Sequence, residues 1–108
     1  HEGVVYESER GNKIYYAEQL AEWMEKQGQL FAASLKIISA VSNQFAQNVM
    51  RQIMEQKLFI ISFNTKINNK NNMVTTVKLQ VESQDKLSQL IKLIENFKET
   101  YEVLRTND

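Results

Sequence analysis

The chain has 108 residues, 43% of them hydrophobic and 24% charged, which are the proportions of one ordinary globular domain. Its 13 basic residues balance its 13 acidic ones, so charge gives no support for nucleic-acid binding. The chain has no cysteine, which excludes disulfides, thiolate metal sites and cysteine nucleophiles and fits a reducing compartment. No apolar run approaches the ~18 residues that span a bilayer, so we expect no membrane contact and a cytoplasmic location.

Residues 1–29 are interpreted as an N-terminal extension, either the end of a preceding small domain or a linker. The start lacks the basic and apolar regions of a signal peptide and also an initiator Met, so the simplest explanation is a fragment of a longer chain. His1 is either native or the remnant of a tag. Residues 4–6 are β-like, and Tyr15–Gln27 combines helical spacing with good helix formers. Gly28 is placed to end that helix.

Alternating apolar residues from Phe31 to Ile37 predict a strand. Ser42 or Asn43 can then cap a helix, whose apolar face has Phe45, Val49 and Ile53 at a spacing of four and which ends near Gln56.

Residues 58–63 are apolar at nearly every position, which predicts a strand buried on both faces and central in its sheet. Asparagine tolerates positive φ, so the asparagine-rich segment 68–72 predicts a hairpin turn. Strict alternation over 73–81 predicts the next strand.

Ser83 or Asp85 can cap a second amphipathic helix, which runs from Leu87 to Phe97, and Tyr101–Arg105 alternates as a closing strand. The predicted fold class is α+β, a ferredoxin-like β-α-β-β-α-β sandwich. Its four antiparallel strands form one sheet with two helices on one face.

The other face of this sheet is expected to be open. Four apolar residues of the first and second strands are assigned to it: Ile38, Ala40, Phe59 and Ile61. An apolar open face commonly contacts a second domain or a second copy of the chain.

No residue set in the sequence supports catalysis or a cofactor. The only histidine is His1, which argues against a metal site, and the three glycines form no phosphate-binding loop. Tyr15, Tyr16 and Trp23 could stack on a base, but the neutral charge favours packing as core or over a sheet edge. We expect no catalytic residue, no metal and no cofactor.

The order of elements, with Leu35-Lys-Ile-Ile-Ser-Ala40 before a helix, resembles the ACT domain, a ferredoxin-like regulatory fold. Residues 68–79 resemble the hairpin of the ACT domain that closes RelA/SpoT-type alarmone enzymes, where Lys-x-x-Met is usual. Leu87-x-x-Leu90-Ile91-x-x-Ile94 and Tyr101-Glu-Val103-Leu-Arg105 are similar to that family's last helix and its Tyr-x-Val-x-Arg end strand.

The resemblance extends weakly upstream. Glu7, Ser8 and Gly11 stand where the family has His, Arg and Cys, and Trp23 matches a tryptophan that ends a strand in the family. The helix formers of this stretch favour a helix over a strand. The resemblance implies a domain boundary at Leu30, with residues 30–108 forming the ACT regulatory domain.

The resemblance also implies where an effector would bind. Effector-binding ACT domains commonly hold a small amino acid at a dimer interface, near an Asp-Arg-x-Gly-Leu-Leu turn after the first strand. Six residues form the candidate effector turn here: Ser42, Asn43, Gln44, Phe45, Ala46 and Asn48. The turn has neither the glycine nor the charged pair, which weakens binding of a ligand carboxylate by backbone N–H groups.

Three functions are compared. The first is the regulatory ACT domain of a (p)ppGpp synthetase/hydrolase, a GTP pyrophosphokinase of the stringent response, which would relay amino-acid starvation or ribosome and tRNA status through protein contacts. The second is an amino-acid-binding ACT dimer of a metabolic enzyme or transcriptional regulator. The third is a dimerisation module without a ligand. The expected partners are other domains of the parent enzyme, a second copy in a homodimer, the ribosome with its tRNA, and a small amino-acid ligand.

Overall fold

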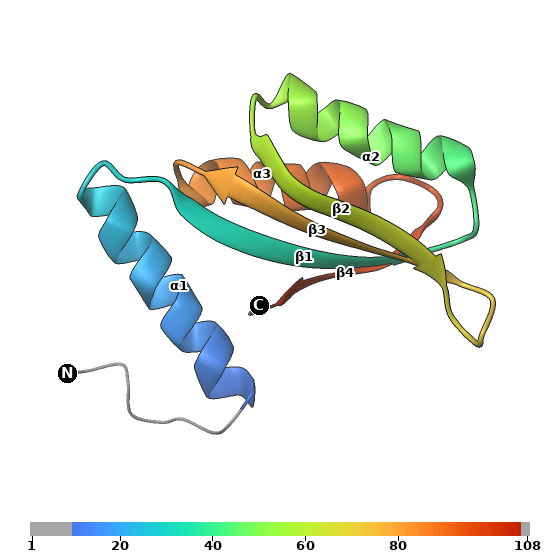
Figure 1. Ribbon diagram of the computed structural model, residues 1–108, viewed down its shortest axis with the longest axis horizontal. Coiled ribbons are helices and arrows are strands. Elements are labelled where there is room, and N and C mark those ends of the chain that lie inside the picture. Colours follow the sequence, from blue (N-terminus) through green and yellow to red (C-terminus); the bar gives the residue numbers. More distant parts are fainter. Residues whose placement is uncertain (1–9, 107–108) are drawn as a thin grey trace.

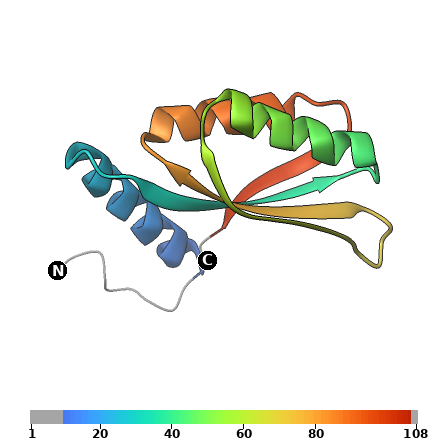
Figure 2. The ribbon, with the colours of Figure 1, turned by 45° about the horizontal axis from the view of Figure 1, so that its top comes forward.

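The computed structural model describes residues 10–106, with side chains from residue 18 onward. Helix α1 (Arg10–Lys26) comes first. The six elements of the predicted sandwich follow it: β1 (Phe31–Ser39), α2 (Asn43–Glu55), β2 (Phe59–Ile67), β3 (Met73–Val81), α3 (Gln84–Glu95) and β4 (Thr100–Thr106). The strands form one antiparallel sheet in the order β2-β3-β1-β4 (Figure 1). Helices α2 and α3 lie together over one face of this sheet (Figure 2). The predicted β-α-β-β-α-β fold is confirmed.

The core lies between the two helices and the central strands. Alternate residues of β1 and β3 point toward the helices, and register pairs such as Leu35–Val77 and Ile37–Thr75 are almost fully buried. Helix α2 contributes Phe45 to this layer, and the Phe45 ring meets that of Phe97 edge-on, with centroids 5.9 Å apart. Burial of these apolar surfaces is the main force that holds the sandwich together.

Strand β2 corrects one prediction. The apolar run 58–63 does not form a central strand, because β2 is an edge strand paired only with β3. Phe59 is 66% exposed and Ile61 46% exposed, whereas Ile60 and Phe63 are half-buried toward the helices. Strands β3 and β1 are central. The hairpin pairs β3 with β2, and the other edge of β3 pairs with β1. The strand with the clearest polar alternation, β3, is therefore central.

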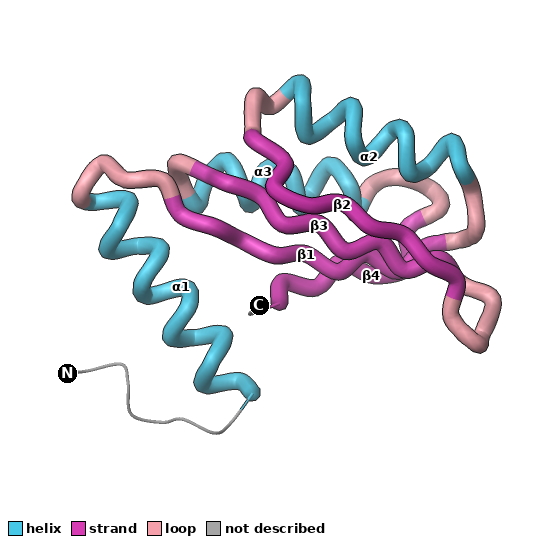
Figure 3. Tube along the Cα trace, in the orientation of Figure 1, coloured by secondary structure: helices cyan, strands magenta, loops and turns pink. Residues whose placement is uncertain are grey.

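The predicted hairpin turn between β2 and β3 is confirmed. The Asn68 side-chain Oδ1 accepts hydrogen bonds from the backbone N–H groups of Lys70 and Asn72, and Asn71 has a φ of 62°. Asparagine therefore supplies both the local acceptor and the left-handed backbone that the turn needs. The loop projects beyond the sheet at the end far from α1 (Figure 3).

The open face of the sheet is less apolar than predicted. Ile38 lies on it, half-buried, and Phe59 lies on it opposite Gln80. Ala40 follows the end of β1, and Ile61 falls in a β-bulge of β2. Because Lys36, Thr76 and Lys78 share the face with these residues, it is a mixed polar and apolar surface.

Residues 10–26 form a helix, as preferred from the sequence, and not the strand that the family resemblance suggested. Gly28, with a φ of 73°, closes the helix: its N–H bonds to the Glu25 carbonyl and that of Gln29 bonds to the Met24 carbonyl. Helix α1 lies to one side of the two-layer sandwich (Figure 1). The predicted β-like run at 4–6 lies outside the described residues. Within residues 10–106, no helix is long and apolar enough to cross a membrane.

Candidate functional site

The candidate effector turn leads from β1 into α2. Ser42 is the N-cap of α2, and its hydroxyl accepts a hydrogen bond from the Phe45 N–H at 3.1 Å. The Phe45 side chain is fully buried, and Ala46 is half-buried against the core. Three of the six predicted residues are therefore engaged in helix capping or core packing.

The polar side chains of the turn face one another along α2. The Gln44 amide donates to Asn48 Oδ1 at 3.3 Å, and the Arg51 guanidinium donates to the same oxygen at 3.0 Å. Asn43 is exposed. Gln44 and Asn48 therefore contact each other one helical turn apart, and their hydrogen bonds stabilise the exposed face of the helix.

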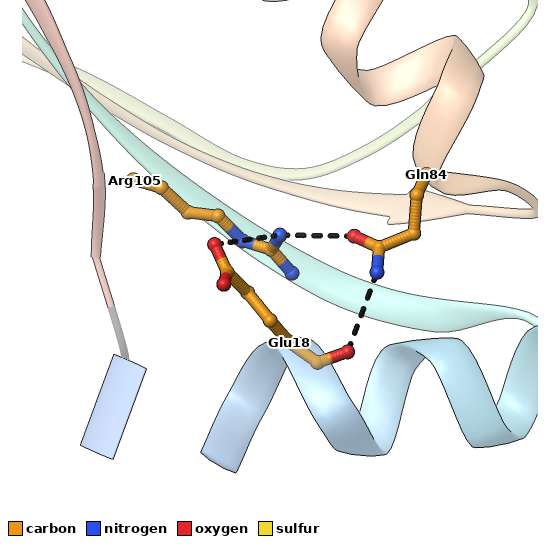
Figure 4. Close-up of polar contacts among 3 residues, drawn as sticks. All are labelled: Glu18, Gln84 and Arg105. Atoms are coloured by element: carbon orange, nitrogen blue, oxygen red, sulfur yellow. Dashed lines mark hydrogen bonds and ion pairs between the residues drawn. The ribbon is translucent and has the colours of Figure 1, made fainter. Parts of the chain in front are cut away.

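A second polar cluster joins α1 to the sandwich and was not predicted. Arg105 on β4 donates from Nη1 to Gln84 Oε1 at 3.1 Å, and the same nitrogen lies 3.7 Å from Glu18 Oε2 (Figure 4). Gln84 Nε2 donates to the Glu18 backbone carbonyl at 3.3 Å. Three elements that are distant in the sequence therefore share one small network.

Burial sets the electrostatics of this network. The Arg105 side chain is 15% exposed and that of Glu18 is 48% exposed. Desolvation lowers the pKa of the Arg105 guanidinium below its ordinary value, and the Glu18 carboxylate acts in the opposite direction. Arginine remains charged at neutral pH, so Glu18 and Gln84 stabilise a partly desolvated cation.

Two turns further along α1, Glu25 makes a second contact with α3. Glu25 Oε1 accepts a hydrogen bond from the Gln84 backbone N–H at 3.1 Å, at the N-terminus of α3. A carboxylate at this end of a helix satisfies an unpaired N–H group and favours the helix dipole. Ala21, between the two contacts, is buried. Helix α1 is therefore docked through specific contacts.

A hollow of about 610 Å³ lies between α1, α3 and β4. Carboxylates of α1 and Arg105 line it, with apolar Leu87, Ile91 and Val103 on the sandwich side. Sequence reasoning placed Arg105 in an end-strand motif and gave it no site role. In the sequence, Arg105 is a charged residue in a strand of alternating pattern. That pattern does not identify a partner residue on another element.

The aromatic residues considered for stacking on a base are only partly described. Trp23 is 55% exposed and so does not pack as core, and the side chains of Tyr15 and Tyr16 lie outside the described residues. In the part of the chain from residue 10 to residue 106, no group of three or more histidines or carboxylates could hold a metal.

A model of the ACT domain family matches residues 27–105. The chain belongs to the ACT domain family. The match begins just after α1 and ends one residue before the end of β4, so it includes the sandwich but for that residue and contains the candidate effector turn. ACT domains are regulatory and non-catalytic. None of the curated proteins matches the chain in sequence.

Solved structures share this fold at low sequence identity. The ACT domain from a GTP pyrophosphokinase of Chlorobium tepidum is similar with a TM-score of 0.63 and 17% identity, over 71% of this chain and 99% of that one. The C-terminal domain of MgtC from Mycobacterium tuberculosis has a TM-score of 0.59 and 15% identity, over 68% of this chain and 83% of that one.

A homoserine dehydrogenase from Thiobacillus denitrificans is also similar, with a TM-score of 0.62 and 14% identity. The match covers 73% of this chain but only 17% of the dehydrogenase. At these identities the similarities establish the fold, which recurs in proteins of different function.

Proposed function

We propose that this ACT domain regulates a GTP pyrophosphokinase of the RelA/SpoT type, relaying amino-acid starvation or ribosome and tRNA status to the catalytic domains through protein contacts. In this proposal residues 30–108 are the regulatory domain and residues 1–29 link it to the preceding part of a cytoplasmic enzyme. The similarity to the Chlorobium tepidum domain, which is matched over nearly its whole length, supports this parent.

We choose a relay through protein contacts over amino-acid binding because the residues of the candidate effector turn are already engaged in the fold. Ser42 caps α2, Phe45 is core, and Asn48 is hydrogen-bonded within the helix. The turn has no glycine to let backbone N–H groups approach a carboxylate. A small amino acid would have to displace contacts that already stabilise the fold.

Helix α1 provides a route for the relay. It precedes the sandwich and contacts it through Glu18, Ala21 and Glu25, at β4 and at the start of α3. A partner that binds one arrangement of α1 and the sandwich more tightly would shift the population toward that arrangement.

Calorimetric titration of the 108-residue chain with valine and isoleucine tests the choice of protein contacts. We expect no heat of binding. A micromolar site that is lost in Gln44→Ala and retained in the exposed control Gln89→Ala would overturn it.

The parent is tested separately, in the natural protein that contains this domain. We expect transfer of pyrophosphate from ATP to GTP, stimulated by ribosomes carrying uncharged tRNA. Arg105→Ala should reduce the stimulation without changing the basal rate, whereas Arg51→Ala on the exposed face of α2 should leave both unchanged. Absence of pyrophosphate transfer would reject this parent.

The alternative is an amino-acid-binding ACT dimer of a metabolic enzyme or transcriptional regulator. The similarity to a homoserine dehydrogenase, a metabolic enzyme, supports it. Sedimentation of the chain with and without amino acids distinguishes the two, because this alternative requires dimerisation that is strengthened by the ligand.

A further inference from the structure

Helices α2 and α3 leave the other face of the sheet open (Figure 2). This open face has a hollow of about 730 Å³. Three lysines from three neighbouring strands line it: Lys36 of β1, Lys66 of β2 and Lys78 of β3. No carboxylate lines it within the described residues. This surface is separate from the effector turn and from the network around Arg105.

Strand register places the three lysines around one residue, Thr76. Thr76 pairs directly with Lys36 across β1 and β3, and it lies two positions from Lys78 on β3. Lys66 pairs with Val74, which makes it the diagonal neighbour of Thr76 on β2. Diagonal neighbours in a sheet have Cα atoms about 7–8 Å apart, within reach of long side chains. The three ammonium groups can therefore meet at one anion above Thr76.

The surroundings of the lysines suit an oxyanion. Ser62, Asn68 and Thr106 also line the hollow and carry hydrogen-bond donors. Lys36 and Lys78 are half-buried, and no ion pair joins any of the three lysines to a carboxylate between residues 10 and 106. Clustered like charges destabilise a sheet, so an anion that binds here would also relieve repulsion.

The distribution of charge favours a compact ligand over a long polymer. On the open face outside the hollow, the positions in register carry Ala32, Gln80, Phe59, Leu104 and Glu102, none of them basic. A nucleic-acid strand needs a continuous basic track, and Glu102 would repel it. The hollow spans three strands, about 10 Å, which suits a short chain of phosphates.

We propose that the open sheet face binds a small oligophosphate, such as pyrophosphate or the polyphosphate group of a nucleotide, through Lys36, Lys66 and Lys78 with Thr76 at their centre. Lysine ammonium groups bind phosphate as point charges. The site goes beyond the proposed regulatory function and does not depend on it.

The test is calorimetric titration of the 108-residue chain with tripolyphosphate and pyrophosphate at constant ionic strength. The site variant is Lys36→Gln/Lys66→Gln/Lys78→Gln. The matched control, Lys26→Gln/Lys92→Gln/Lys98→Gln, changes net charge equally at exposed positions outside the hollow. We expect binding to weaken roughly tenfold or more in the site variant and to stay near the original affinity in the control.

Thermal unfolding gives a second readout that does not require the site variant to bind anything. Without ligand, the site variant should unfold at the same or a higher temperature than the original chain, because repulsion is removed. Tripolyphosphate should raise the midpoint of the original chain and of the control only.

Three results would overturn the proposal. The first is that the original chain binds neither phosphate, and the second is that the control loses as much affinity as the site variant. The third result is that a poly-glutamate peptide or single-stranded RNA displaces tripolyphosphate at a much lower concentration than that of tripolyphosphate itself.

Discussion

Arg105 and Glu18 stand near opposite ends of the described chain, yet Arg105 Nη1 lies 3.7 Å from Glu18 Oε2 (Figure 4). Arg105 belongs to the last strand of the sandwich, whereas Glu18 belongs to the helix that precedes it. Together with Gln84, the pair connects α1, α3 and β4. With the hydrogen bond from the Gln84 N–H to Glu25, it joins the preceding helix to the ACT domain.

The first prediction concerns this contact. Arg105→Ala removes the hydrogen bond to Gln84 and the ion pair to Glu18, and we expect a loss of about 1–2 kcal/mol in the free energy of unfolding. Amide hydrogen exchange should accelerate in α1 more than in α2. Arg51→Ala, which breaks an exposed contact to Asn48, is the control. Unchanged exchange in α1 would mean that Arg105 does not hold the helix.

The second prediction concerns the two serine caps. Ser42 and Ser83 each accept a hydrogen bond from the N–H three residues ahead, at 3.1 Å in both cases. Ser42→Ala and Ser83→Ala should each cost about 1 kcal/mol in urea unfolding. A Ser42→Ala chain of unchanged stability would indicate that Ser42 is available for another role in the effector turn.

The third prediction uses two helix ends with the same geometry. Gly28 and Lys57 both have positive φ, at 73° and 63°, and each follows a helix. In both cases, carbonyls of the last helical turn accept hydrogen bonds from the N–H of the positive-φ residue and from that of the residue after it. A Cβ on Gly28 would meet no atom within 4 Å, so Gly28→Ala should cost about 1 kcal/mol through backbone strain alone. Lys57→Gly should instead stabilise the chain by roughly 0.5–1 kcal/mol. Changes of the same sign in thermal unfolding would contradict this.

The fourth prediction concerns Thr75, which is fully buried in β3 opposite Ile37. Its hydroxyl has no hydrogen-bond partner among the described residues. Thr75→Val keeps the shape and removes a desolvated polar atom, so the free energy of unfolding should rise by about 1 kcal/mol. Thr65→Val, at the exposed neighbour on β2, should have little effect. A marked loss of stability in Thr75→Val would show that the hydroxyl has a partner.

Much of the fold was predictable because its signals are local. The period of two in 73–81 and the period near 3.6 in 87–97 determine which side chains share a face. Ser42, Ser83 and Gly28 mark helix ends because their chemistry satisfies the unpaired groups there. These patterns were sufficient for the element order, the helix-covered face and most of the core.

The sites were less predictable. The ACT resemblance indicated the effector turn, but whether Phe45 and Asn48 are available to a ligand depends on packing. Arg105 and Glu18 could not be paired from the sequence, because no local pattern connects a strand to a helix at the other end of the chain.

By itself, the sequence determined the element order β-α-β-β-α-β and the residues that share each face, because residue type and spacing carry that information directly. Only the tertiary structure decided that β2 is an edge strand, that α1 docks on α3 and β4, and that Lys36, Lys66 and Lys78 surround Thr76. The first and the last depend on which strands pair and in what register, and the docking of α1 depends on contacts between elements far apart in the chain. Hydrophobic periodicity specifies the face of a side chain but not its neighbour on another element.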